Sequence, residues 1–304
     1  MMPQQHGGRR LAFVALFAAG ASWGLGFPLG KLAMRELAPP HMILLRFAVA
    51  SIAALPFAIG PDARRMFRSP AVLVSGLFYG LAFVVQFEGL ARVSVTLAAL
   101  LVGAMPALIA VAARLLGEPV SRASWAGVIA ATLGAALIAG KPGGAGSVAG
   151  VVLSLVSLLL FLVWLLSAKR APSVASAMAL PAVTIVVGTL AVLPVALAMQ
   201  GMPDLRLSAP AWVGIVGQGL ISTLFATAAW QYGAARIDSA SAGVFINLEP
   251  LIGAILGVAL FGDRLTAALV AGGLLILGGS IAVVRGERPA PPAALTGGSP
   301  PSPA

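Results

Sequence analysis

Six side chains that could bind a small amphipathic solute recur at helical spacing inside two long apolar runs. They are Tyr79, Phe83 and Gln86 in residues 70–91, and Gln218, Ser222 and Phe225 in residues 210–235. In each run the spacing is i, i+4, i+7, which places the three side chains on one face of a helix. A face that mixes amide, hydroxyl and aromatic groups suits a small molecule with polar and apolar parts. Hydrogen bonds between helices, without a ligand, are the alternative.

Three tryptophans and one asparagine extend this candidate substrate site. Trp23 lies near the middle of an apolar run, whereas membrane tryptophans normally gather at the interfaces. Trp164 and Trp230 lie nearer the ends of their runs, so anchoring at the interface competes with a binding role. Each ring could stack on a substrate ring or amine, or simply pack between helices. Asn247 joins the set because a polar side chain inside lipid tends to face a bundle interior or a water-filled cavity.

Two opposite charges fall at similar depth in neighbouring apolar runs. Arg46 lies within residues 41–60 and Glu88 within residues 70–91. A charge inside the bilayer costs about 2.5–3.5 kcal/mol on insertion scales, so it needs a partner or water. We predict an ion pair between Arg46 and Glu88 that fixes or gates one side of the bundle. The alternative is that each side chain reaches the membrane surface separately.

Glu249 is the deepest charge and is followed directly by Pro250. A proline inside a helix removes a backbone donor and frees a carbonyl one turn earlier. Glu249 could therefore contact a substrate ammonium or carry a proton, or it could stay protonated or bond to a neighbouring helix. Pro106 forms a matching helix break in the first half of the chain, and Pro28, among several glycines, makes residues 11–34 a candidate bending element.

These residues support neither a catalytic site nor a bound cofactor. Gly20-Ala21-Ser22-Trp23-Gly24 fits the pattern of a serine hydrolase elbow, but it lies mid-helix with no histidine at its depth. The chain has no cysteine, and its two histidines lie at the N-terminus and in a loop, which is a poor basis for a metal site. No nucleotide-binding motif occurs. We expect neither an enzyme nor a protein with a metal or cofactor.

Composition explains why these polar groups stand out. Of 304 residues, 60% are hydrophobic and only 9% are charged, whereas soluble domains carry about a quarter. The net charge of +10 comes from basic residues scattered singly, so it does not indicate a nucleic-acid partner. We therefore expect the protein to lie in the lipid bilayer. Ten apolar runs are long enough to cross it as helices: 11–34, 41–60, 70–91, 94–116, 123–140, 147–168, 174–199, 210–235, 239–261 and 266–285.

The two halves of the chain match each other at an offset of about 144 residues. Met105-Pro106 aligns with Glu249-Pro250, and Gly127 and Gly134 align with Gly272 and Gly279 one residue further on. Two copies with five crossings each must lie in opposite orientations. We therefore predict an all-α integral membrane protein in which two inverted five-helix repeats enclose a central cavity.

The predicted units are a first repeat (1–140), a linker (141–146), a second repeat (147–286) and a disordered Pro-rich tail (287–304). Lys and Arg are about twice as frequent on the side where the chain begins, which predicts that both termini are cytoplasmic.

The chain resembles the drug/metabolite transporter superfamily with tandem EamA repeats over residues 9–286. The resemblance rests on the order of Ser22-Trp23-Gly24, Leu45-Arg46-Phe47, Gly89-Leu90, Pro106, Gly117-Glu118-Pro119, Trp164, Leu248-Glu249-Pro250 and Phe261-Gly262-Asp263-Arg264-Leu265-Thr266. Asp263 departs from the glutamate that is more frequent in the family.

This resemblance implies a multi-pass transporter in the bacterial inner membrane that exports amino acids or other small metabolites. The chain is similar to the aromatic amino-acid exporters. Export of other metabolites or cationic drugs is the nearest alternative, and a polytopic membrane enzyme or a channel is more distant. The expected partner is a small-molecule substrate, and the sequence leaves open whether a homodimer forms.

Overall fold

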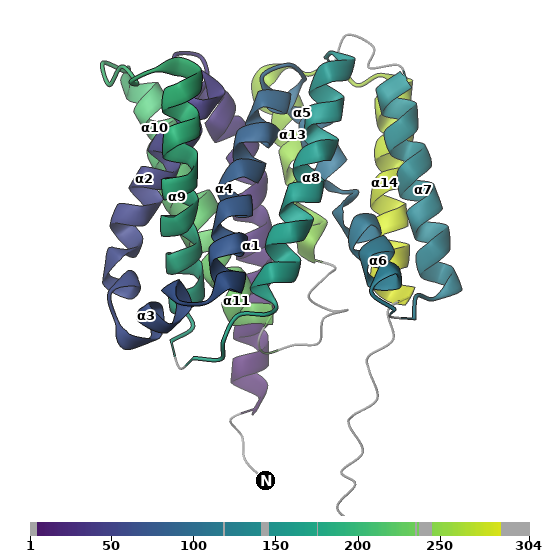
Figure 1. The fold of residues 1–304 in the computed structure, drawn as a ribbon. Helices are drawn as coiled ribbons and strands as arrows, with labels where there is room; N and C mark the ends of the chain where they lie inside the picture. The colour runs from purple at the N-terminus through teal and green to yellow at the C-terminus, as the bar shows by residue number, and fades with distance from the viewer. Residues whose placement is uncertain are drawn as a thin grey trace, which may run out of the picture.

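The structure, a computed structural model, describes residues 5–117, 119–140, 146–174, 176–234, 236 and 245–286. Every regular element in these ranges is a helix (Figure 1), which confirms the all-helical prediction. The helices are α1 (Gln5–Ala33), α2 (Pro39–Ala58), α3 (Pro61–Phe67), α4 (Pro70–Leu90), α5 (Val95–Val102), α6 (Met105–Leu115), α7 (Arg122–Gly140), α8 (Val148–Ala168), α9 (Ala179–Gln200), α10 (Ala209–Gly217), the π-helix η1 (Gln218–Phe225), α11 (Ala226–Ala234), α13 (Leu248–Phe261) and α14 (Ala267–Gly286). The predicted tail and all but the last residue of the predicted linker lie outside the described ranges.

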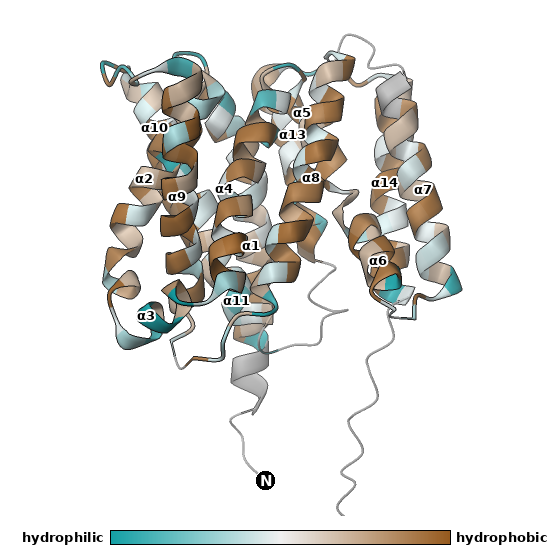
Figure 2. Ribbon diagram, viewed as in Figure 1, coloured by the Kyte–Doolittle hydropathy of each residue, from teal (hydrophilic) through white to brown (hydrophobic). Residues whose placement is uncertain are grey.

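Eight spans in the described ranges are long and apolar enough to cross a membrane. Two are composite, since Val95–Leu115 joins α5 to α6 and Ala209–Ala234 joins α10, η1 and α11. Two further apolar helices, Arg122–Leu137 and Leu248–Phe261, are shorter. Hydrophobic residues follow the helices and hydrophilic residues gather at the two ends of the bundle (Figure 2). The chain is a multi-pass membrane protein, and the count of ten crossings stays a prediction.

Small residues allow the helices to approach closely. Along α7 and α14, Gly127 faces the carbonyl of Gly279, and Gly134 faces the carbonyl of Gly272, with no room for a side chain. Between α4 and α8, Gly89 lies against Ser154 in the same way. Such contacts suit a membrane bundle, because close van der Waals packing takes the place of the hydrophobic effect between helices in lipid.

Hydrogen bonds fasten the end of the bundle at which α1 finishes, called here the upper end after its place in Figure 1. Lys31 Nζ donates to the carbonyl of Leu90 at 2.9 Å, joining α1 to α4. Asp263 Oδ2 accepts from the backbone N–H of Thr96 at 2.7 Å, joining the chain beyond α13 to the start of α5. Glu36 accepts from the hydroxyl and the backbone N–H of Ser208, and these bonds hold the pKa of Glu36 below its usual range.

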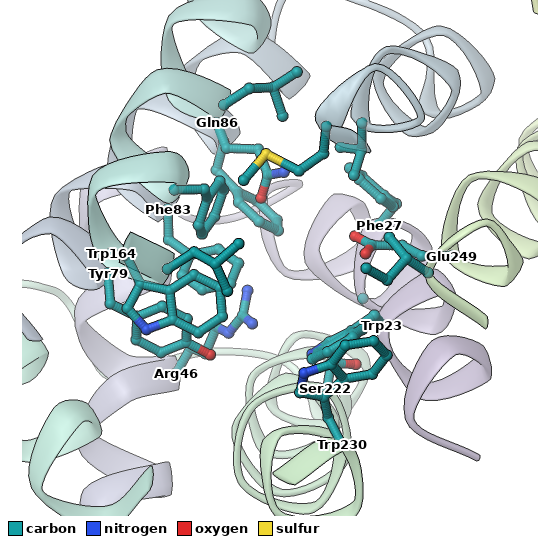
Figure 3. A pocket seen from close by; sticks show the side chains of 18 of the residues that line it. Trp23, Phe27, Arg46, Tyr79, Phe83, Gln86, Trp164, Ser222, Trp230 and Glu249 are labelled. Atoms are coloured by element: carbon teal, nitrogen blue, oxygen red, sulfur yellow. The ribbon is translucent and has the colours of Figure 1, made fainter. Parts of the chain in front are cut away.

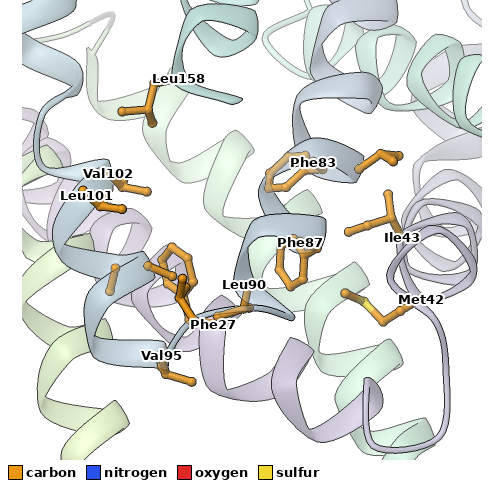
Figure 4. Packing of buried hydrophobic residues seen from close by; sticks show 14 of the residues in the cluster. Phe27, Met42, Ile43, Phe83, Phe87, Leu90, Val95, Leu101, Val102 and Leu158 are labelled. Atoms are coloured by element: carbon orange, nitrogen blue, oxygen red, sulfur yellow. The ribbon is translucent and has the colours of Figure 1, made fainter. Parts of the chain in front are cut away.

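A buried apolar cluster lies just inside this fastened end (Figure 4). Phe27 of α1 and Phe87 and Leu90 of α4 belong to it, together with Val95 and Leu101 of α5. Each of these side chains is at most 3% exposed. The upper end of the bundle is therefore tightly packed. The opposite end, where α1 begins, is called here the lower end.

The fourth apolar run is interrupted at Gly103 and Ala104, between α5 and α6 and close to the helix break expected at Pro106. Two other local features differ from the sequence expectation. The eighth apolar run is π-helical over Gln218–Phe225, so Phe225 does not share the face of Gln218 and Ser222 and is 50% exposed. The short α3 connects α2 to α4 and was not predicted, since seven residues with two arginines do not form an apolar run.

Pro28 does not break the helix, because α1 runs through it without interruption, and bending of α1 at this proline stays a prediction. A proline removes one hydrogen bond, and the neighbouring turns of α1 are held by packing. Gly24 lies against Ile252 of α13, and Gly30 lies against Phe87 of α4. Pro106 and Pro250 do follow breaks: α6 begins one residue before Pro106, and α13 begins two residues before Pro250.

Candidate functional site

A cavity of about 110 Å³ lies in the middle of the bundle. A water molecule needs about 10–15 Å³ on this measure, so the cavity has room for several waters or part of a small solute. Its walls come from α1, α2, α4, α5, α6, α8, η1, α11 and α13. The lining residues are Trp23, Gly26, Phe27, Arg46, Tyr79, Phe83, Gln86, Phe87, Val102, Met105, Ile109, Leu158, Phe161, Trp164, Leu165, Ser222, Trp230, Ile246 and Glu249.

One wall of the cavity is a cluster of rings from α4 and α8. Tyr79 lies 4.9 Å from Trp164 and 5.0 Å from Phe83, measured between ring centroids. Phe161 lies 4.9 Å from Phe83 in an edge-to-face arrangement. Such tilted and edge-to-face contacts are favourable geometries for aromatic pairs, and they hold the rings in place as one apolar wall.

The facing wall is formed by α1, η1 and α11 (Figure 3). Trp23 and Trp230 lie 5.4 Å apart between ring centroids, with their planes inclined at 45°. Ser222 beside them donates a hydrogen bond of 2.6 Å to the carbonyl of Ser22. The hydroxyl proton of Ser222 is therefore used between helices, and its oxygen lone pairs can still accept a hydrogen bond in the cavity.

Arg46 enters the cavity from α2 and is only 2% exposed. Its Nε donates to Thr223 Oγ1 on η1 at 2.6 Å. Its guanidinium carbon lies 3.9 Å from the centroid of the Phe83 ring, a close cation–π contact. The π-helix is what brings Thr223 into place, because Thr223 Oγ1 donates five residues back to the carbonyl of Gln218 at 2.9 Å.

The predicted ion pair between Arg46 and Glu88 is wrong. Glu88 pairs instead with Arg92, one turn further along the chain, through its carboxylate and its carbonyl. Equal depth in two helices does not set the direction in which their side chains point. Glu88 faces the upper surface, whereas Arg46 faces the interior.

Glu249 lies on the opposite side of the cavity from Arg46 (Figure 3). It belongs to the first turn of α13, where the helix dipole favours a negative charge. None of the hydrogen bonds formed by the described residues involves its carboxylate. The cavity thus presents a guanidinium group on one wall, a carboxyl group on the other, and aromatic rings between them.

The structure brings most of the predicted substrate-site residues to this one cavity. Those that line it are Trp23, Tyr79, Phe83, Gln86, Trp164, Ser222, Trp230 and Glu249. Gln218 does not, because its amide nitrogen donates to the carbonyl of Gly26 and its Oε1 is buried without a partner. Asn247 does not either, and both polar atoms of its side chain are buried without a partner.

Sequence reasoning missed three phenylalanines of the lining, although the signal was available. Phe87 follows Phe83 by four residues, Phe27 follows Trp23 by four, and Phe161 precedes Trp164 by three. Residues at these separations share a helix face. The same rule that selected Tyr79 and Phe83 would therefore have extended the aromatic set.

The described ranges contain no candidate metal site, since no three His, Cys, Asp or Glu side chains in them are close enough to hold an ion. The arrangement is suited to binding an amphipathic solute inside a membrane.

Comparison with protein families decides what kind of membrane protein this is. The EamA-like transporter family matches twice, over residues 10–140 and 148–285. The chain belongs to the EamA-like transporter family. It is a membrane transporter with two EamA repeats, one in each half.

Individual relatives agree with the family assignment. The EamA chain is 28% identical, over 275 residues, to an uncharacterized transporter of Archaeoglobus fulgidus, covering 86% of this chain and 95% of that one. It is 33% identical over 67 residues to the permease-like protein YdzE of Bacillus subtilis, covering 22% of this chain and 86% of that one. A protein of known crystal structure has the same fold, with a TM-score of 0.63, 20% identity, and coverage of 90% and 96% of the two chains.

Proposed function

We propose that the protein is a secondary transporter that exports small amphipathic metabolites by alternating access, with amino acids that carry aromatic or large apolar side chains favoured. The observation that carries the proposal is the central cavity of an EamA transporter, lined by eight aromatic rings, by the buried guanidinium of Arg46 and by the carboxyl group of Glu249. Binding sites of this kind are mostly apolar with a few polar groups that orient the ligand.

The proposal includes ten crossings arranged as two inverted five-helix repeats, residues 1–140 and 147–286. Opposite helix directions support it. Ser124, near the start of α7, donates to the carbonyl of Val283, near the end of α14, so these corresponding helices are antiparallel. α1 finishes at the upper end, where Lys31 bonds to Leu90, whereas α8 starts there, with Gly150 against Gly89 and Arg92.

We propose that the lower end faces the cytoplasm of the bacterial inner membrane and that both termini lie on that side. The start of α1 and the basic α3, with Arg64 and Arg65, both lie at the lower end (Figure 1). An excess of lysine and arginine marks the cytoplasmic side of membrane proteins. With the upper end closed by Lys31, Asp263 and the apolar cluster, substrate would enter from below, and the halves would rock to release it above.

A second candidate function is the export of organic cations. Glu249 lies near Trp23 and Trp230, and a carboxylate beside aromatic faces is the usual setting for a quaternary or aromatic ammonium group. Arg46 argues against this candidate, because it places a second positive charge in the same cavity as the ligand.

Counterflow in proteoliposomes tests the proposal. Vesicles loaded with unlabelled L-phenylalanine should take up external labelled phenylalanine faster than empty vesicles, because only a carrier exchanges substrate across a moving site. Tetraphenylphosphonium replaces phenylalanine in a parallel arm. Exchange of the cation alone would favour the second candidate, and equal uptake by loaded and empty vesicles in both arms would contradict a carrier.

A further inference from the structure

We propose that Arg46 binds the carboxylate of the substrate, so that the transported solutes are carboxylates bearing an aromatic or large apolar group. This inference rests on the proposed function, since it names the substrate class of the same cavity. It replaces the gating role that the sequence suggested for Arg46.

The first argument is that Arg46 is a buried charge that forms no ion pair at contact distance in the described part of the chain. Its one hydrogen bond is the contact from Nε to Thr223, and the one ion pair within the described ranges joins Arg92 to Glu88. Glu249 is the other charged residue of the cavity and lies on the far wall. A guanidinium that is 2% exposed and has no anion beside it is costly in a membrane bundle. A substrate anion at this position offsets that cost.

The second argument is that the guanidinium is held in one orientation. Thr223 Oγ1 accepts from Nε, and its own proton is donated to the carbonyl of Gln218, so the hydroxyl cannot turn away. Phe83 supports one face of the guanidinium at 3.9 Å from its ring centroid. With Nε occupied, the remaining edge is the pair Nη1 and Nη2, which fits a carboxylate through two parallel hydrogen bonds.

The third argument is the placement of the other groups. A carboxylate at Arg46 lies beside the ring wall of Tyr79, Phe83 and Trp164, so an attached side chain has an aromatic surface to pack on. Glu249 across the cavity is then in place for an α-ammonium group. The carboxylate is the primary requirement, because Arg46 is fixed by two contacts and the Glu249 carboxylate by none.

Binding of four matched ligands tests the inference on the intact protein. Three of the five tryptophans line the cavity, so quenching of tryptophan fluorescence reports occupancy. The ligands are L-phenylalanine, 3-phenylpropionate, L-phenylalaninamide and phenethylamine, which share the ring and differ in charge. The two carboxylates should bind at least about tenfold more tightly than the two amines, as expected for losing a charge-assisted hydrogen-bond pair. Equal affinities, tighter binding of the amines, or no binding of either carboxylate would overturn the inference.

Substitutions separate binding from a purely structural role. Arg46→Gln should remove the preference for carboxylates, and Arg46→Lys should keep part of it, because a lysine retains the charge but not the fork. The matched control is Arg92→Gln, which removes an exposed arginine outside the cavity and should leave the preference unchanged. If Arg46 only braces the π-helix, Arg46→Gln will weaken all four ligands alike, and that result also overturns the inference. The ligand series with the unmodified protein decides the question even if a variant fails to fold.

A failure of this inference can be distinguished from a failure of the proposed transport function. Counterflow of any solute supports a carrier whatever Arg46 does, whereas the ligand series reads the charge preference of the cavity without any transport.

Discussion

The helix breaks before Pro106 and before Pro250 have a similar backbone arrangement but different side chains around them. In the first half, α5 ends at Val102 and α6 starts at Met105, and the freed carbonyl of Gly103 accepts a hydrogen bond from Ser280 on α14. In the second half, Asn247 immediately precedes α13, and its amide is buried without a hydrogen-bond partner.

The aligned residues after the two breaks show the same contrast. Met105 and Glu249 both line the cavity, but one is apolar and the other is a carboxylate with no hydrogen bond in the described ranges. At the first break the carbonyl of Gly103 has a donor within the protein, whereas the second break leaves polar groups without a hydrogen-bond partner in or beside the cavity. Since the fold tolerates methionine in one copy, we infer that the charge in the other copy serves the substrate.

The largest expected effect comes from replacing Glu249, after the second break, by methionine, which is the residue at the aligned position after the first break. Glu249→Met should reduce phenylalanine counterflow by at least about tenfold, because it removes the partner of the α-ammonium group. It should not lower the midpoint of thermal unfolding in detergent, because it removes a carboxyl group that forms no hydrogen bond or ion pair in the described ranges. Undiminished counterflow would show that the charge serves no substrate.

The next effect is on stability at the first break. Ser280→Ala leaves the Gly103 carbonyl without its donor and should lower the free energy of unfolding by about 1–3 kcal/mol. Counterflow per folded molecule should stay within twofold of the unmodified protein, as an approximate bound on an indirect effect. Thermal unfolding and counterflow on one preparation measure both. A variant with normal stability and lost transport would reverse the roles assigned to the two breaks.

A smaller effect of opposite sign is expected at Asn247. Its backbone, with φ of −71° and ψ of −8°, accepts leucine, and its amide makes no hydrogen bond. Asn247→Leu should therefore raise the free energy of unfolding, by up to about 1 kcal/mol, because an unsatisfied buried amide is removed. Unfolding monitored by circular dichroism checks this. A loss of stability similar to that of Ser280→Ala would mean that the amide has a partner in the membrane.

The smallest effects are expected at the prolines themselves. Pro106 and Pro250 lie in the first turn of α6 and α13, where the missing N–H has no intrahelical acceptor to lose. Pro106→Ala and Pro250→Ala should each lower the free energy of unfolding by about 0.4–1 kcal/mol, through the unfolded chain alone. Changes much larger than this, or confined to one proline, would show that the two breaks are held differently.

The sequence predicted the helices well because apolar runs of membrane length have few other solutions. The run 70–91 became α4 (Pro70–Leu90), and 147–168 became α8 (Val148–Ala168). The sequence also predicted correctly that Tyr79, Phe83 and Glu249 face the interior, because a polar or aromatic group inside such a run favours the interior of the bundle.

Features that depend on rotation about a helix axis were not predictable from the sequence. Depth along the chain suggested a pair between Arg46 and Glu88, but the two side chains point to different places. The π-helix at Gln218–Phe225 was missed for the same reason, since an α-helical spacing was assumed and Phe225 was placed on the wrong face. Thr223, which orients Arg46, carries no signal in the α-helical pattern.

The effect of phenylalanine on thermal unfolding, compared between two variants, tests most directly whether the two breaks have different roles. A ligand that binds only the folded state raises the unfolding midpoint. At one fixed concentration, L-phenylalanine should raise the midpoint of Ser280→Ala by as much as that of the unmodified protein, from a lower starting value. It should raise the midpoint of Glu249→Met by clearly less, because the lost contact weakens binding. A normal rise in Glu249→Met, or none in Ser280→Ala, would contradict the account.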